Sequence, residues 1–429
     1  MAHRLAWLSG LVFPLAALMS LLWISVPRGA AQQGSREVHR RLPAADEERE
    51  NDLKKHFIRD KSMFASLASG AITPTTPDQE EVIATAAKWF VYRVTWEEAL
   101  KTPGTMDQFL REFRGEALLP AYKKRADNEE FRKLFCKQLI IQMRKVLNND
   151  SHANRVRGAL LLRALPDLGD DRVTDLLVEV LDDKTQFAEV KLMAAQALRD
   201  IFQRGTISSN EQETRCVRSL LTFLDDESRV TAMTGAGEVG AVRYIRRDII
   251  RALGETRLPK TKGEKPALIA LALLRFVVQD HISPAPSFEE RVLAVMNLAQ
   301  LERRQAPDYQ PDYAAYHVAE FLVEYARQMN GGGRLDAFTK YYAAVLRQAL
   351  MTFRNKSGGN DDISKYVAAM VQRANVVLSA LDNEQPPDVS DLSSWLEKTP
   401  HSSSLFRGDP KAVVGSQVSL QTNEPASPP

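Results

Sequence analysis

Apolar residues recur along most of the chain with the spacing of an amphipathic helix. Between about residues 76 and 381, aliphatic and aromatic side chains fall at positions i, i+3, i+4 and i+7, which places them on one helical face. The clearest stripes cover residues 173–181, 190–201 and 217–224. No segment shows the strict alternation that a half-buried strand requires. The pattern therefore predicts an all-α fold.

Short polar turns divide the helical pattern into pairs. Residues 169–171 (Gly-Asp-Asp) and 182–184 (Asp-Asp-Lys) separate successive stripes, and connections this short favour antiparallel helix hairpins. We interpret the aspartate pairs as helix ends and N-caps rather than as an edge that binds a cation. Thr76, followed by Pro77 and several acidic residues, predicts the start of ordered structure. Further helices are expected at residues 81–100, 106–124, 129–147, 265–278, 288–301 and 363–381.

The stripes also resemble one another. Val-Arg or Val-Lys is followed by Ala-Leu on the same helix at residues 156–165, 190–198 and 242–253. The first two starts lie 34 residues apart (190 − 156) and the next two lie 52 apart (242 − 190). The longer interval contains residues 226–240, which we interpret as an insertion between two helices. Self-similarity of this kind predicts a helical repeat architecture.

These Val-Arg and Ala-Leu pairs, with the Gly-Asp-Asp-Arg-Val turn and the Leu-Asp-Asp helix end, resemble HEAT repeats, most clearly over residues 153–256. Tetratricopeptide repeats share the 34-residue period, but their Trp, Gly-Tyr and Pro signature is missing. The resemblance implies an α-solenoid of antiparallel hairpins, a surface that usually binds proteins. We therefore expect HEAT-like repeats at 76–303. A more irregular helical region with core aromatic residues is expected at 304–384.

The two ends of the chain differ from the helical part. Residues 5–26 are almost continuously apolar and lead to small residues ending at Ala31, which is typical of a secretory signal peptide. The stretch is also long enough to span a bilayer, so residues 1–31 are either a signal peptide or an N-terminal membrane anchor. Both alternatives predict export to the periplasm, cell envelope or extracellular space. Residues 32–75 are expected to be a charged tether, and residues 385–429 a flexible Ser- and Pro-containing tail.

Charge and cysteine content narrow the range of functions. Residues 1–31 hold two of the 57 basic side chains and no acidic one, which leaves 57 − 2 = 55 basic against 55 acidic side chains. A neutral chain lacks the positive field that attracts nucleic acid, which we exclude as a partner. Cys136 and Cys216 are too few for a disulfide framework. Because each lies beside an apolar helix face, two unpaired core thiols are favoured over a disulfide between them.

Two motifs suggest chemistry, and each has a simpler explanation. Residues 235–240 match the G-x-G-x-x-G dinucleotide fingerprint, but no buried strand precedes them, so the insertion is the preferred interpretation. His317, Glu320 and Glu324 share one side of a helix and could bind a metal or line an enzyme pocket. A solvated face opposite the apolar one explains them more simply. We accordingly predict no catalytic residue, no metal and no cofactor.

A basic run from Arg243 to Lys265 is the strongest candidate for a binding site. It contains eight basic against three acidic residues, a net charge of +5. Arg243, Arg247 and Arg251 share a helical face that could hold an acidic protein partner or an anionic headgroup, although a solvated face would explain them as well. With Arg246 they form what we call the arginine face, the predicted partner-binding site.

The sequence thus predicts an exported, HEAT-repeat-like scaffold or protein-binding module without catalysis. Two alternatives stay open. One is a membrane-anchored envelope assembly factor, in which residues 5–26 contact the membrane. The other is a helical-repeat enzyme with a pocket near His317.

Overall fold

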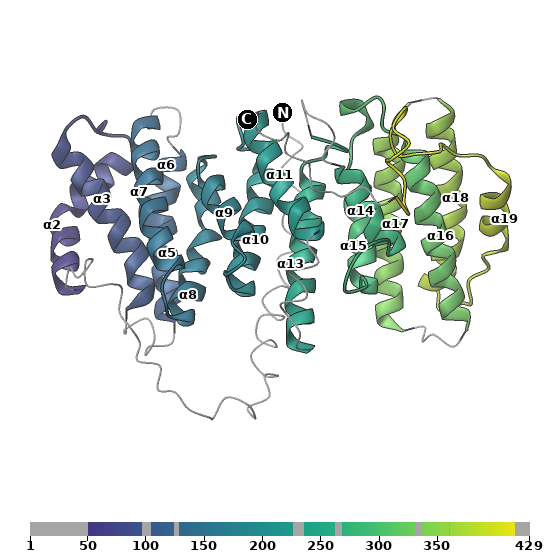
Figure 1. Ribbon diagram of the computed structural model, residues 1–429, viewed down its shortest axis with the longest axis horizontal. Helices are drawn as coiled ribbons and strands as arrows, with labels where there is room; N and C mark the ends of the chain where they lie inside the picture. The colour runs from purple at the N-terminus through teal and green to yellow at the C-terminus, as the bar shows by residue number, and fades with distance from the viewer. Residues whose placement is uncertain are drawn as a thin grey trace, which may run out of the picture. The chain divides into compact units, whose positions relative to one another are not determined.

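The computed structural model describes seven segments of the chain, residues 50–96, 104–123, 128–225, 236–261, 268–331, 336–359 and 361–416 (Figure 1). These segments are helical and contain no strand, apart from an isolated antiparallel bridge between Tyr309 and Phe406. The prediction of an all-α fold is confirmed. The predicted leader, residues 1–31, lies outside the described segments. Within them, no helix is both long and apolar enough to cross a membrane.

Short connections join most of the helices. The first part of the chain contains α2 (Glu50–Ala68), α3 (Pro77–Tyr92), η2 (Arg93–Thr95), α5 (Thr105–Glu112), the π-helical η3 (Phe113–Leu118), α6 (Leu119–Lys123), α7 (Glu129–Leu147), α8 (His152–Leu162), η4 (Leu165–Leu168), α9 (Val173–Asp182), α10 (Ala188–Arg204) and α11 (Asn210–Asp225). The second part contains α13 (Ala236–Glu255), α14 (Ile269–Val278), α15 (Phe288–Leu298), η5 (Arg303–Gln305), α16 (Pro311–Asn330), α17 (Ala337–Ser357), α18 (Asp362–Asp382) and α19 (Ser390–Lys398).

Helix starts follow local capping chemistry. Thr76 caps α3: its side chain accepts a hydrogen bond from the backbone N–H of Gln79, the Gln79 side chain accepts one from Thr76, and Pro77 occupies the first turn. The same reciprocal arrangement of Ser287 and Glu290 begins α15. The helix start predicted at Thr76 is therefore confirmed in its position and in its mechanism.

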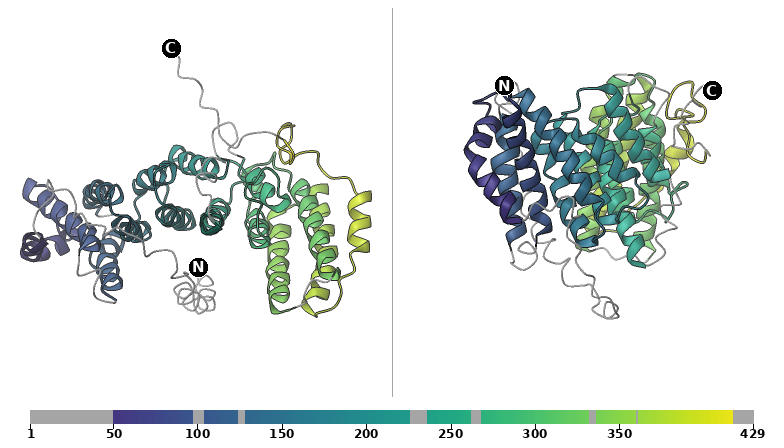
Figure 2. Two further views of the ribbon diagram at one scale, coloured as in Figure 1. Left: turned by 60° about the horizontal axis from the view of Figure 1, so that its bottom comes forward. Right: turned by 60° about the vertical axis from the view of Figure 1, so that its left-hand side comes forward.

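Alternate helices pack side by side in two rows (Figure 2). One row contains α8, α10, α13, α15 and α17, and the other contains α7, α9, α11, α14, α16 and α18; each helix contacts the next one of its row. Helices adjacent in the chain also pair across the rows, as α7 does with α8 and α9 with α10. Gly254 shows how closely α13 and α15 approach, because a Cβ atom there would lie 2.1 Å from the side-chain oxygen of Asn297.

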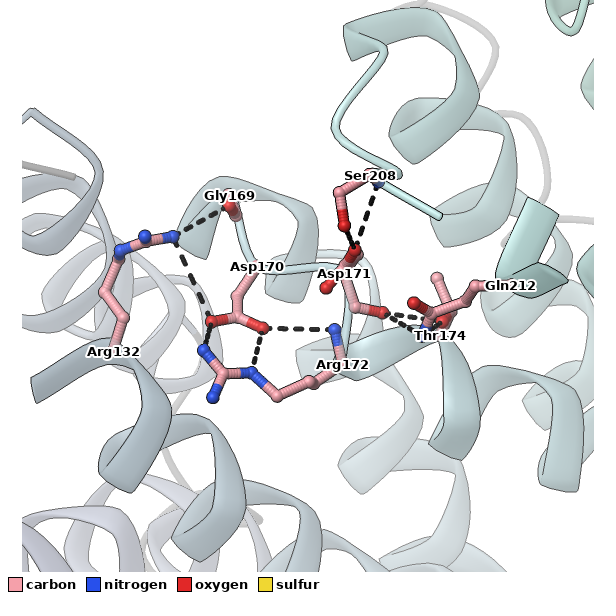
Figure 3. A network of polar contacts seen from close by, with 8 residues as sticks. All are labelled: Arg132, Gly169, Asp170, Asp171, Arg172, Thr174, Ser208 and Gln212. Carbon is pink, nitrogen blue, oxygen red and sulfur yellow. Dashed lines mark hydrogen bonds and ion pairs between the residues drawn. The ribbon is translucent and has the colours of Figure 1, made fainter. Parts of the chain in front are cut away.

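A polar turn before α9 connects it to α7 (Figure 3). Gly169 adopts the left-handed conformation with φ of 65°, and its carbonyl accepts a hydrogen bond of 3.0 Å from Arg132 of α7. The buried Asp170 carboxylate accepts two hydrogen bonds from the Arg172 guanidinium, at 2.7 and 2.5 Å. The buried charge is thus paired within the turn, as burial of a carboxylate requires.

The same turn also connects α9 to the helix that follows in its row (Figure 3). The Asp171 carboxylate accepts hydrogen bonds from the backbone N–H and the hydroxyl of Ser208, which precedes α11. Gln212 of α11 donates to the Asp171 carbonyl at 2.9 Å and to the Thr174 hydroxyl at 2.6 Å. The aspartate pair therefore acts at a helix start, in line with its predicted structural role.

The two cysteines are core residues. Cys136 on α7 and Cys216 on α11 are both buried and free, which confirms the preference for unpaired thiols. Burial raises the pKa of both thiols, that of Cys216 to about 12. A thiol that stays protonated in the native state is a poor nucleophile, so neither cysteine serves as a reactive group.

The segment expected to be a tether contains a helix. Within the predicted tether at 32–75, α2 packs on α3 and α7, and its residues Leu53, Phe57, Phe64 and Leu67 are buried. Its end is fixed by Asn128, whose side chain donates to the carbonyls of two residues in the last turn. The expectation was wrong here because dense charge on the exposed side of α2 obscures a single apolar stripe.

The segment expected to be a flexible tail is ordered as far as residue 416. After α19 the chain runs back along the start of α16, where the N–H of Gln310 donates to the carbonyl of Leu405 at 2.8 Å. Leu405, Phe406 and Ala412 are buried. The prediction for 385–429 was therefore wrong over residues 385–416, because a few apolar residues and backbone hydrogen bonds fix a segment of low helical propensity. Residues 417–429 lie outside the described part.

The core position of α2 leads to a stability prediction. Phe64 contacts the rings of Phe57, Phe90, Phe131 and Phe135 from α2, α3 and α7. We expect Phe64→Ala to lower the free energy of unfolding by about 3–5 kcal/mol, the usual cost of removing a buried aromatic ring. Denaturant unfolding followed by circular dichroism measures this change.

The control for that variant lies on the exposed side of the same helix. Ile58→Ala should change the free energy of unfolding by less than about 0.5 kcal/mol, because Ile58 is exposed. If Phe64→Ala were as stable as Ile58→Ala, α2 would be a tether after all.

Candidate functional site

The structure gives each residue of the arginine face an intramolecular partner. Arg246 of α13 is buried and forms a bidentate pair with Glu290 of α15, at 2.8 and 3.1 Å. It also donates to the carbonyls of Ser283 and Pro284 before α15. Arg246 is therefore inaccessible to a partner, and its assignment as a binding residue is corrected. Its role is to hold α13 against α15.

The other arginines of this face are more accessible but are also paired. Arg247 forms an ion pair with Glu289, and Arg243 donates to the carbonyl of Ala285 at 3.2 Å. Arg251 pairs with Asp248 at 3.2 Å, and its side chain is 43% exposed. The net charge of +5 for residues 243–265 therefore overstates the positive potential at this surface, because acidic side chains of α13 and α15 pair with the arginines. An acidic partner would have to share these arginines with them.

The Arg246–Glu290 pair leads to a second stability prediction. The Glu290 side chain is 0% exposed, so losing Arg246 leaves a buried charge with only the more distant Arg243, at 3.8 Å, and the Ser287 N–H as partners. We expect Arg246→Met to lower the free energy of unfolding by about 3–5 kcal/mol. Arg251→Met, which removes the same charge from the exposed end of the face, should cost less than about 1 kcal/mol. Equal losses in denaturant unfolding of the two variants would contradict the structural role of Arg246.

His317 and its neighbours do not form a metal centre. His317 Nδ1 lies 2.7 Å from a carboxylate oxygen of Glu320, whereas Glu324 binds Arg291 of α15 in a bidentate pair. The two carboxylates thus have different partners. Within the described segments, no group of three or more His, Cys, Asp or Glu side chains is placed to hold a metal ion.

The glycine fingerprint falls partly outside the described segments. Residues 226–235 are among those not described, and α13 begins at Ala236. Gly237 and Gly240 therefore belong to the first turns of a helix, and residues 236–240 of the predicted insertion are part of α13, while its residues 226–235 lie outside the described segments.

A pocket lies near His317, but His317 does not line it. The pocket has a volume of about 550 Å³ and is bounded by α16, α18, α19 and the segment after α19. The side chains that matter chemically are Asp312, Tyr366, Trp395 and His401. A volume of this size is typical of small-molecule sites.

The floor of the pocket carries buried polar groups. Asp312, in the first turn of α16, is 4% exposed, and one of its oxygens accepts a hydrogen bond of 2.7 Å from the N–H of Ser402. No described residue donates a hydrogen bond to its other oxygen, nor pairs with the buried hydroxyl of Tyr366. Burial, and then the charge of Asp312, raises the pKa of Tyr366. The tyrosine hydroxyl is thus held neutral beside the carboxylate.

Aromatic rings form the walls. The rings of Tyr366 and Trp395 lie 4.6 Å apart, and His401 stacks on Tyr316 at 4.1 Å. The Tyr366 and His401 rings are separated by 6.3 Å. Helices α18 and α19 and the following segment each contribute one ring to the lining, and Tyr316 of α16 packs on His401. The pocket therefore combines one buried carboxylate with several π faces.

Comparison with known proteins assigns neither the fold nor the pocket to a family. No family model matches the chain, and no curated protein or solved structure matches it. The resemblance to HEAT repeats stays a prediction, and function has to be argued from the residues themselves.

One sequence-based alternative placed an enzyme pocket near His317, but the residues that line the pocket were missed because they come from distant segments. In the sequence, Asp312 resembles any acidic residue after a proline at a helix start. Tyr366 has the spacing of a core residue. Trp395 and His401 fell in the region expected to be flexible. The one available signal was compositional, since Trp395, Leu405 and Phe406 are unusual residues for a flexible tail.

Proposed function

We propose that the chain is an exported α-solenoid, similar to HEAT-repeat proteins, that works as a protein-binding scaffold without catalysis. The observation that carries this proposal is a recurring sequence separation between polar groups that join neighbouring helices. Five such contacts each span 37 residues, namely Arg132 to Gly169, Asp167 to Arg204, Asp171 to Ser208, Asp182 to Ser219 and Arg246 to Ser283. Others span between 33 residues, from Arg291 to Glu324, and 44 residues, from Arg246 to Glu290. A stack of hairpins of similar length produces such a recurring offset.

The longer repeat interval supports the same interpretation. Gln196 of α10 donates to Asp248 of α13 at 2.8 Å across a separation of 52 residues, the interval that separates Val190 from Val242. The two Val-Arg/Lys helices thus pack in register although their separation is larger. An insertion before α13 accounts for the extra length, because α10 and α13 still contact each other directly.

The surface best suited to a protein partner crosses α13, α15 and α17 and includes part of the arginine face. Tyr244, Phe338 and Tyr341 are exposed there, the last two by 72% and 62%. We call these three residues the aromatic surface. Exposed aromatic side chains beside arginine are characteristic of protein interfaces and of their energetic hot spots.

Contacts between the three helices join these residues into one area. The Arg247 guanidinium lies 5.2 Å above the Tyr244 ring and pairs with Glu289 of α15. Tyr342 of α17 lies near Glu289; burial, and then the charge of this carboxylate, raise the pKa of Tyr342 to about 12. Tyr341 lies directly beside Tyr342, with the ring centroids 5.4 Å apart. Charged and aromatic groups therefore alternate across the three helices.

This surface yields a binding prediction. A tagged mature chain with Phe338→Ala and Tyr341→Ala should bind its protein partner at least about tenfold more weakly, since two exposed hot-spot rings are removed. The partner is first isolated from the native envelope fraction with the wild-type chain. Its affinity for each purified variant is then measured by calorimetry.

Two further variants complete the test of the partner site. Val376→Ala on α18 removes an equally exposed apolar side chain elsewhere and should leave the affinity unchanged. Arg251→Glu should lower the affinity for an acidic partner. This loss of affinity should be smaller in high salt, because salt screens exposed charges. If neither the aromatic pair nor Arg251 affects binding, the surface is assigned incorrectly.

The export proposal is tested independently at the N-terminus. If residues 1–31 are a signal peptide, mass spectrometry of the protein from its native source will find a mature chain that begins at Gln32. Recovery of intact residues 5–26 in the membrane fraction would instead favour the membrane-anchored assembly factor. A full-length chain in the soluble cytoplasmic fraction would contradict both.

A further inference from the structure

The pocket floor carries a negative charge without a matching cation. One oxygen of Asp312 accepts a hydrogen bond from Ser402, while no described residue donates to the other. A buried carboxylate is costly unless it is paired, and the buried carboxylates Asp170, Asp248 and Glu290 of this protein all have arginine partners. Asp312 is thus the exception among them.

The position of Asp312 in the first turn of a helix does not account for its burial. The helix α3 begins with the same Pro-Asp pair, Pro77 and Asp78, and there the aspartate is exposed. A helix N-terminus favours a nearby negative charge whether or not water reaches it. In α16 the segment after α19 covers Asp312, and the carboxylate then lines the pocket.

Cationic side chains near the pocket have partners of their own. Lys365 lies 3.2 Å from Asp362 at the rim, and Arg373 lies 3.4 Å from Asp391 behind the Trp395 ring. The lining contains two carboxylates, Asp312 and Asp362, and one lysine, so its acidic side chains outnumber its lysine by one. The site therefore favours a cation.

The walls favour an organic cation over a metal ion. Tyr366, Trp395 and His401 line the pocket with aromatic rings, which attract alkylated ammonium groups through their negative π faces. The lining has one buried carboxylate, Asp312, and an exposed one, Asp362, that pairs with Lys365, which together offer too few hard oxygen ligands for a divalent ion. From this combination we propose that the pocket binds an alkylammonium group, with Asp312 as its counter-ion and the adjoining rings of Tyr366 and Trp395 on one side of it.

The site takes the ammonium group from either of two sources, a free small amine or a lysine side chain of a bound polypeptide. The proposal does not depend on the scaffold function, because Asp312 and the aromatic surface lie on different helices. The probes are N-acetyl-lysine amide, its Nε-trimethyl form and its neutral Nε-acetyl form. Each is titrated by calorimetry into the mature chain.

We expect saturable binding of the two cations and at least about tenfold weaker binding of the neutral probe, because only the cations are attracted to the buried charge of Asp312. Asp312→Asn keeps the shape of the side chain and an oxygen that accepts the hydrogen bond from Ser402. It should lower the affinity for the cationic probes at least about tenfold. Trp395→Leu keeps apolar bulk but removes a π face, so about a three- to thirtyfold loss is expected.

Asp78→Asn is the matched control, since it removes the corresponding acid from the start of α3 and should leave affinity unchanged. Circular dichroism melting of each variant confirms that the fold is retained. Equal binding of neutral and cationic probes, unchanged affinity in Asp312→Asn, or no saturable binding of any cation would overturn the proposal.

The source of the cation is resolved by a second pair of probes. A lysine-containing decapeptide that binds at least tenfold more tightly than N-acetyl-lysine amide indicates a polypeptide source. Equal affinities indicate a free amine. Both results support the ammonium site, and they leave the test of the aromatic surface unaffected.

Discussion

The apolar faces that neighbouring helices share are the constraint on which the rest of the structure depends. Helix α10 illustrates it: Ala194, Ala197 and Leu198 are completely buried, and the helix contacts α8, α9 and α13. A helix that buries its surface on three neighbours has no stable fold by itself. The approach is closest to its limit between α13 and α15, where a methyl group at Gly254 would collide with Asn297 of the next helix in the row.

Apolar contact alone does not determine the register between two packed helices. Polar groups at the helix ends determine it through directional hydrogen bonds. The Gly-Asp-Asp turn joins α7, α9 and α11 through directional hydrogen bonds, and Arg246 does the same for α13 and α15. Buried charges are costly unless they are paired, so each such pair selects one register. The arginine face therefore helps to hold α13 against α15, in addition to forming part of the surface.

Sequence reasoning identified what depends on local chemistry. The capped start at Thr76 and the helix at 129–147 were predicted correctly, because side-chain spacing and capping determine them. It failed for α2 and for residues 385–416, whose order comes from contacts with distant segments. The arginine partners were missed for the same reason, since Glu289 and Glu290 lie about 40 residues away in sequence. The four pocket residues are spread over almost 90 positions, and no local pattern brings them together.

Pocket and C-terminal segment form one structural unit. The same segment supplies His401 to the wall, the Ser402 N–H to Asp312, and the Phe406 bridge to Tyr309. Detachment of this segment would expose Asp312 to water and remove part of the wall. A cation held by Asp312 and these rings binds the docked state better than the detached one, so binding and docking stabilise each other by linkage. The end of the chain that appeared least structured in the sequence thereby completes the pocket of this helical protein.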